Sequence, residues 1–100
     1  MIIRVDIDNT ICRTNGCNYS LSTPIKENIA KINKLYDSGN EIIYWSSRGV
    51  GSGKNLHELT IQQFVKWGVK YHKLELNKPV FDYLVDDRTI LIEDVEKNLF

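Results

Sequence analysis

MIIRVDIDNT, residues 1–10, is the stretch of sequence that decides the fold. Its segment from Ile2 to Ile7 is rich in Ile and Val, which is typical of a strand buried in a parallel sheet. Asp6, Asp8 and Thr10 lie at the carboxyl end of this segment. Ligands bind beyond the carboxyl ends of the strands in open parallel sheets. These side chains are therefore the first candidates for a functional site.

Predicted helices and strands alternate along the rest of the chain. In order, they are a polar β-flap over residues 10–21 with Asn15-Gly16 at its turn, a helix that begins at Thr23-Pro24 and ends at Gly39, a strand over residues 41–46, a helix over 55–67, strands over 69–76 and 82–85, and a closing helix over 89–100. A glycine-rich loop over residues 47–54 separates the second strand from the second helix.

This order of elements predicts a single α/β domain over residues 1–100. We expect a three-layer αβα, Rossmann-like parallel sheet with right-handed crossovers and a small β-flap. With the strands numbered along the chain, the expected order is 4-1-2-3, which places the functional edge between the first and fourth strands. The segments between strands hold only the flap and single helices, so no cap domain fits.

The balanced composition gives no long-range electrostatic field that would favour a highly charged partner. The 100 residues include 13 basic and 13 acidic side chains, a formal net charge of +0, which argues against nucleic acid or an anionic membrane as a partner. No apolar run approaches the ~20 residues that span a bilayer, and an acidic residue at position 6 does not fit a signal peptide. We expect a cytoplasmic protein whose two cysteines, Cys12 and Cys17, are reduced.

Polar clusters follow each of the four predicted strands. They are Asp6-x-Asp8-x-Thr10, Ser46-Ser47-Arg48, Lys78-Pro79 and Asp86-Asp87-Arg88. Two carboxylates about 4 Å apart repel by roughly 4 kcal/mol at an effective dielectric near 20, so converging aspartates need a cation. Oxygen ligands without a converging His or Cys favour Mg²⁺.

Phosphate is the ligand that the remaining polar residues favour. Ser46 and Lys78 would hold phosphoryl oxygens beside the metal, and Ser47 and Arg48 are further candidates for phosphate contacts. A structural ion pair is an equal alternative for Arg48. The spacing of His57 and His72 indicates neither a metal site nor a catalytic triad.

At these residues the chain resembles the haloacid dehalogenase-like (HAD) superfamily of phosphatases, whose four motifs it matches in order over nearly its whole length. Within that superfamily it is similar to small capless phosphatases associated with bacterial capsule and surface-polysaccharide biosynthesis. The segments that carry this closer resemblance are residues 46–53, 58–60, 67–74 and 77–79. A more distant resemblance, around residues 86–89, is to the 3′-phosphatase domain of phage polynucleotide kinase.

The resemblance implies a two-step hydrolysis. Asp6 would attack phosphorus and form an aspartyl-phosphate, while Asp8 protonates the leaving alcohol and then deprotonates the hydrolytic water. Ser46 and Lys78 would bind the transferring phosphoryl group. Mg²⁺ would be held by Asp6, by the backbone carbonyl of Asp8, and by one of the two neighbours Asp86 and Asp87, a choice that stays open. Asp8 favours a phosphatase, because the dehalogenases and transport ATPases of the superfamily lack that second aspartate.

Several functions remain open at this point. The closer resemblance implies a small phosphorylated sugar or polyol as substrate, and the more distant one implies a polynucleotide 3′-phosphate. The neutral net charge favours the small molecule. A phosphoacceptor domain of the response-regulator type is disfavoured by the order of the motifs. In such domains the adjacent acids follow the first strand and the acceptor follows the third, whereas here the adjacent pair Asp86-Asp87 follows the fourth predicted strand. A non-catalytic module that binds Mg²⁺ and phosphate is a further alternative. The open site could be closed by the flap or by a neighbouring subunit, so an oligomer is compatible with the sequence.

Overall fold

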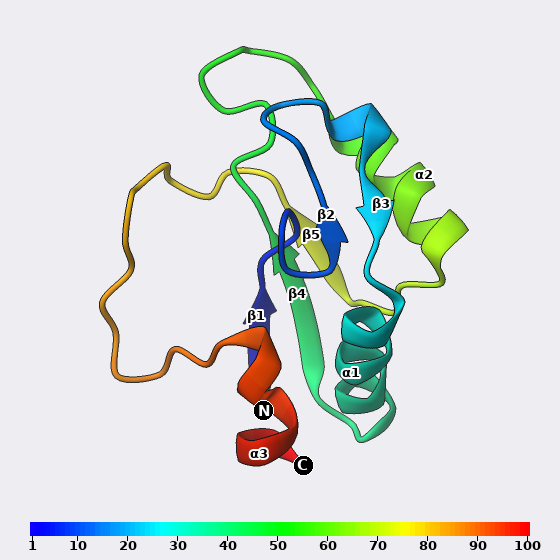
Figure 1. Cartoon of the computed structure of the whole chain (residues 1–100), viewed down its shortest axis with the longest axis vertical. Coiled ribbons are helices and arrows are strands. Elements are labelled where there is room, and N and C mark those ends of the chain that lie inside the picture. The colour runs from blue at the N-terminus through cyan, green and yellow to red at the C-terminus, as the bar shows by residue number, and fades with distance from the viewer.

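The computed structural model describes all residues from 1 to 100 and is built on a parallel sheet of three strands. The strands are β1 (Ile2–Val5), β4 (Glu41–Trp45) and β5 (Lys73–Glu75), in the order β1-β4-β5 (Figure 1). Ile3 pairs with Ile42 and Tyr44 pairs with Leu74. The parallel α/β architecture is therefore confirmed, with the first three predicted strands in the predicted order.

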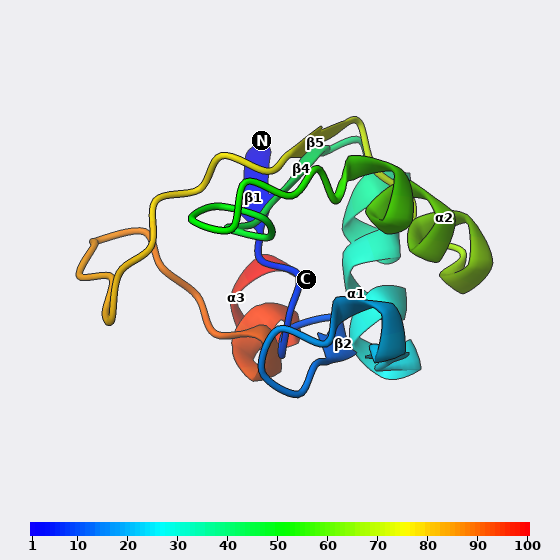
Figure 2. The ribbon, with the colours of Figure 1, turned by 90° about the horizontal axis from the view of Figure 1, so that it is seen from above.

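The helices all lie on one face of this sheet, so the expected three-layer arrangement is wrong. Figure 2 shows α1 (Lys26–Asp37), α2 (His57–Trp67) and α3 (Val95–Leu99) on the same side of the strands. The order β1-β4-β5 moves across the sheet in one direction, and right-handed crossovers then place both connecting helices on the same face. The short α3 packs beside α1 on that face.

The core fills the space between the sheet and the helices. It joins the inward side chains of the strands to the apolar faces of the helices: Val5, Ile7, Ile42, Tyr44, Ile29, Ile32, Leu35, Phe64 and Val95. The opposite face carries charged pairs instead, since the Arg4 guanidinium contacts the Glu75 carboxylate at 2.6 Å and lies over the Trp45 ring. The sheet is thus buried on one side and partly polar on the other.

The predicted flap is present but differs at its second arm. β2 (Cys12–Arg13) and β3 (Thr23–Pro24) form an antiparallel pair, and a single 3-10 turn, η1 (Tyr19–Leu21), lies between them. Thr23-Pro24 therefore belongs to the flap and does not begin the helix; α1 starts at Lys26. The reason is that Pro24 is paired in register with Cys12, which keeps that backbone extended.

The segment after β5 departs most from the prediction. Residues 82–85, the expected fourth strand, form an exposed part of a long loop that swings away from the sheet (yellow to orange in Figure 1). Tyr83 is 90% and Val85 96% exposed, and one edge of β1 has no neighbouring strand. The chain then returns through η2 (Ile92–Asp94) into α3, so the closing helix is also shorter than expected. No helix has the length and apolar character needed to cross a bilayer.

Candidate functional site

A cavity of about 300 Å³ lies at the carboxyl ends of the parallel strands. Five of the predicted site residues line it: Asp6, Asp8, Ser46, Ser47 and Lys78. They come from three segments that are distant in sequence, after β1, after β4 and after β5. The parallel sheet brings these segments together because it places the carboxyl ends of its strands at one edge.

Asp6 offers a carboxylate to this cavity. Its side chain is 43% exposed. The hydroxyl of Thr10 donates to Oδ2 at 3.3 Å, and the Nζ of Lys78 lies 3.5 Å from Oδ1. One carboxylate beside one cation, open to a ligand, is an arrangement suited to attack on an electron-poor centre such as phosphorus.

Lys78 is held in place from both ends. Its backbone N–H donates to the carbonyl of Ser46 at 3.2 Å, which ties the segment after β5 to the end of β4. Its Nζ lies 4.9 Å from the centre of the Trp45 ring and 5.4 Å from that of Phe81. The aromatic faces shield the ammonium group on one side and leave it directed at Asp6. A phosphate oxygen entering the cavity would meet this cation.

Ser46 lines the cavity and also forms hydrogen bonds with the backbone of Glu75 and of Arg48. The residue is 3% exposed, its N–H donates to the carbonyl of Glu75, and its Oγ accepts the backbone N–H of Arg48 at 3.1 Å. The hydroxyl proton of Ser46 is therefore available to a ligand oxygen. Ser47 is less buried and lines the cavity beside it.

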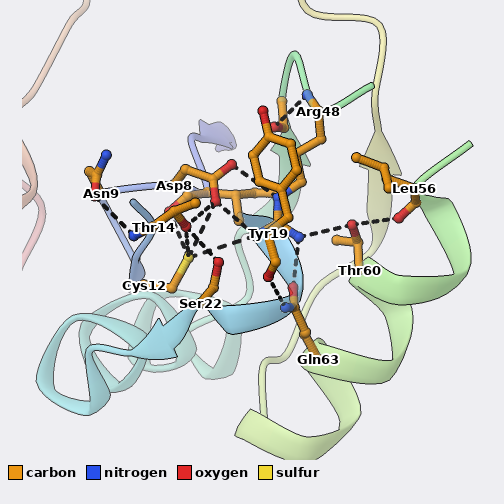
Figure 3. Close-up of polar contacts among 12 residues, drawn as sticks. Asp8, Asn9, Cys12, Thr14, Tyr19, Ser22, Arg48, Leu56, Thr60 and Gln63 are labelled. Carbon is orange, nitrogen blue, oxygen red and sulfur yellow. Dashed lines mark hydrogen bonds and ion pairs between the residues drawn. The ribbon is translucent and has the colours of Figure 1, made fainter. Parts of the chain in front are cut away.

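Asp8 lines the same cavity but has different partners, because the backbone turns directly after it. Asn9 adopts φ +62°, a left-handed conformation that asparagine tolerates. Arg48 contacts both oxygens of Asp8, through Nε at 3.0 Å and Nη2 at 2.8 Å, and the Thr14 hydroxyl also donates to Oδ1 (Figure 3). Burial raises the pKa of Asp8, but the hydrogen bonds from Arg48 and Thr14 and the Arg48 charge outweigh it and lower the pKa below its usual value.

Arg48 does not line the cavity, so the contact with phosphate for which it was a candidate is not formed by this geometry. Its side chain is 0% exposed. Nη1 donates to Thr60 Oγ1 at 3.1 Å and to Gln63 Oε1 at 2.7 Å, while Nη2 also points at the sulfur of Cys12 at 3.8 Å (Figure 3). A guanidinium group has five N–H donors, and all of them have an acceptor here. The alternative role, a structural ion pair, is the one that the structure shows.

Asp86 and Asp87 are not brought to Asp6 and Asp8. Both are exposed, and neither lines the cavity. No group of 3 or more His, Cys, Asp or Glu side chains is placed to hold a metal ion. The predicted cluster of four carboxylates required residues 82–85 to pair with β1, and that pairing is not formed.

Comparisons with known proteins establish the fold alone. The chain is similar to a crystal structure of an MCSG target from Vibrio cholerae, with a TM-score of 0.81 and 24% sequence identity over 98% of this chain and 89% of that chain. No protein-family model matches the chain, and no curated protein matches it. The α/β architecture described above is thus shared with a solved protein over nearly the full length.

Sequence reasoning missed the contacts that Arg48 makes with Thr60 and Gln63. Thr60 and Gln63 lie on the inner face of α2, and Tyr19 lies on the flap, with its ring 5.0 Å from the Arg48 guanidinium. The only sequence signal is that Thr60 and Gln63 are polar, three apart, and placed among the apolar positions of an amphipathic helix. Buried polar side chains need partners, so such a pair indicates a buried polar group opposite the helix.

Proposed function

We propose that this chain is a phosphohydrolase that transfers the phosphoryl group of a phosphomonoester to the carboxylate of Asp6. The observation that carries the proposal is that Asp6 shares one cavity with Lys78 and with the hydroxyls of Ser46 and Ser47. A carboxylate nucleophile, a cation and hydroxyl donors are the groups that phosphoryl transfer to a side chain requires. Each stands at a strand end, where the backbone holds it in place.

In this proposal each side chain has one task. Asp6 attacks phosphorus as the bond to the leaving oxygen breaks, and Lys78 and Ser46 bind the phosphoryl oxygens on which charge collects. Asp8 gives a proton to the departing alcohol and regains one from the water that hydrolyses the aspartyl-phosphate, so it must enter the cycle protonated even though Arg48 and Thr14 lower its pKa. Since both oxygens of Asp8 accept hydrogen bonds from Arg48, one of these bonds must give way when the proton moves.

The cavity as described does not fit a divalent cation. Asp6 supplies one free carboxylate, the side chain of Asp8 is occupied by Arg48, and the pair at positions 86 and 87 lies outside. Mg²⁺ prefers an octahedral set of oxygen ligands, and here the ammonium group of Lys78 already lies 3.5 Å from the one carboxylate that could join such a set. We therefore derive no chemical step from a metal in this geometry.

We propose that Mg²⁺ binds when residues 82–85 pair with β1 as a fourth strand. The free edge of β1 can accept residues 82–85 as a parallel neighbour, which would complete the sheet order 4-1-2-3. The exposed side chains of Tyr83 and Val85 favour such pairing, because aromatic and β-branched residues are enriched in strands and an unpaired edge is a template for one. Asp86 and Asp87 would then follow their strand as Asp6 and Asp8 follow β1, and one of them would join Asp6 and the Asp8 carbonyl around Mg²⁺.

Hydrogen exchange tests this arrangement. We expect Mg²⁺ to slow exchange of the backbone amides of residues 82–87, because strand pairing and metal binding protect them. The double variant Asp86→Asn/Asp87→Asn should lose this effect, while Asp82→Asn, a nearby exposed acid, should keep it. Calorimetry that shows Mg²⁺ binding without any change in exchange would contradict the fourth strand, and absence of Mg²⁺ binding would contradict the cofactor.

A substrate panel tests the activity itself. We propose a small phosphorylated sugar or polyol of polysaccharide biosynthesis as substrate, which is what the resemblance to small capless phosphatases implies. The net charge of +0, and Lys78 as the only cationic side chain lining the cavity, favour such a small molecule over a nucleic acid. We expect phosphate release from sugar or polyol phosphates with Mg²⁺, and its loss with a chelator. Faster release from a 3′-phosphorylated oligonucleotide would favour a polynucleotide phosphatase, and no release from any member of the panel would contradict a phosphohydrolase.

A further inference from the structure

A single side chain of α2 connects the flap to the acid–base residue of the proposed site. Gln63 is 7% exposed and uses both ends of its amide. Its Oε1 accepts from Arg48 Nη1 at 2.7 Å, and its Nε2 donates to the backbone carbonyl of Tyr19 at 2.6 Å (Figure 3). Arg48 in turn holds both oxygens of Asp8. The contacts on both paths are short; the bond between Gln63 and Arg48 is buried, and the bonds to Asp8 and to Tyr19 are partly buried.

The two groups that Gln63 fixes line the cavity, whereas Gln63 does not. Tyr19 forms one wall of the cavity from the flap, and Asp8 contributes a carboxylate. A flap built on two-residue strands has little stability of its own, because a short two-stranded hairpin is marginal in water. Its position therefore depends on contacts with the body of the domain, and the Gln63–Tyr19 bond is one of these.

Thr60 and Gln63, which both accept hydrogen bonds from Arg48, are each oriented by a second partner. Thr60 donates its hydroxyl proton to the carbonyl of Leu56 at 2.8 Å, which leaves its oxygen as an acceptor for Arg48. The amide of Gln63 can satisfy Arg48 and Tyr19 together in one orientation only, with oxygen toward the guanidinium and nitrogen toward the carbonyl. Buried polar networks in which every member is satisfied are rigid.

We infer that Gln63 is a positioning residue that acts on Asp8 through Arg48 and on the substrate-binding wall through Tyr19. The expected effects on kcat and KM rest on the proposed phosphohydrolase function, whereas the expected effect on the position of the flap does not. Loss of the Gln63 carbonyl loosens the hold on Asp8 and lowers kcat. Loss of the Gln63 amide N–H frees the flap and raises KM. The two effects belong to different atoms of one side chain and can be separated.

Two substitutions at Gln63 separate them, with Gln62→Leu as the matched control. Gln63→Leu removes both the acceptor and the donor, and Gln63→Glu keeps an acceptor for Arg48 but loses the donor to Tyr19. Gln62 is the neighbouring, exposed residue, whose only side-chain bond is to Glu58 at 3.3 Å. We expect kcat to fall about tenfold to a hundredfold in Gln63→Leu, the range for partners that orient a functional group. In Gln63→Glu, KM should rise with a smaller loss of kcat.

Hydrogen exchange supplies a readout that needs no activity. The amide of Ser22 donates to the Tyr19 carbonyl and that of Leu21 to Asn18, so both report the state of the flap. Both Gln63 variants should exchange these amides faster than the wild-type protein, and Gln62→Leu should not. Unchanged flap exchange in both Gln63 variants, or equal losses of kcat without a rise in KM, would overturn the inference. Faster flap exchange in a protein that hydrolyses no phosphomonoester would contradict the proposed function and leave the positioning role of Gln63 standing.

Discussion

Asp6→Asn is expected to reduce phosphate release by at least about a thousandfold, because an amide cannot accept the phosphoryl group and the covalent route is closed. The fold should be unaffected. The Asp6 side chain is 43% exposed, and its two polar contacts, with Thr10 and Lys78, are long. Replacement of an exposed side chain that makes no strong contact usually changes the free energy of unfolding by less than about 0.5 kcal/mol.

The measurement is the steady-state rate of phosphate release with the best substrate of the panel, at saturating Mg²⁺. Thermal unfolding of the same samples checks that the variant is folded. Asp82→Asn is the control, since Asp82 is an exposed acid outside the cavity. A folded Asp6→Asn variant that keeps more than a tenth of the wild-type rate would exclude Asp6 as the nucleophile.

Arg48→Met is expected to lower the free energy of unfolding by about 3–5 kcal/mol, the range for removal of one partner from a buried ion pair. The substitution leaves Asp8 charged and largely buried, and it also leaves Thr60 and Gln63 without their common donor. A loss of this size is a large part of the total for a small domain, which is about 5–15 kcal/mol. Urea denaturation at neutral pH measures it.

The matched control is Arg4→Met, which breaks the ion pair with Glu75 on the open face of the sheet. There the Arg4 and Glu75 side chains are 43% and 35% exposed, so the expected loss is only about 0–1 kcal/mol. Equal small losses in the two variants would show that the Arg48–Asp8 pair is not a buried anchor.

The dependence of the free energy of unfolding on pH should also change at low pH when Arg48 is replaced by Met. Because the pKa of Asp8 is lowered in the folded state, this group adds stability at pH values above its ordinary pKa of about 3.9. That contribution is lost as the pH falls through the folded-state pKa. Without Arg48 the pKa of Asp8 is lowered less, so the difference in unfolding free energy between wild type and Arg48→Met should shrink at low pH.

Local patterns in the sequence were sufficient for much of the fold and for half of the site. The three strands, their order and the flap follow from apolar runs, from Asn15-Gly16 and from the alternation of helices and strands. The placement of Asp6, Ser46 and Lys78 at one edge follows from the parallel arrangement alone, because a residue within a few positions of the end of a parallel strand has little freedom in where it lies. These features depend on neighbours in sequence and on general rules of chain connection.

The remaining features depended on contacts that no local pattern encodes. Residues 82–85 have the composition of a strand, but whether they pair with β1 is decided by the free energy of docking a long loop, not by strand propensity. The role of Arg48 was equally out of reach, since its partners come from a strand end 40 residues earlier and from α2, 12 and 15 residues later. Only the tertiary structure could show that a buried cation needs all of them, because burial removes the water that would otherwise satisfy its charge.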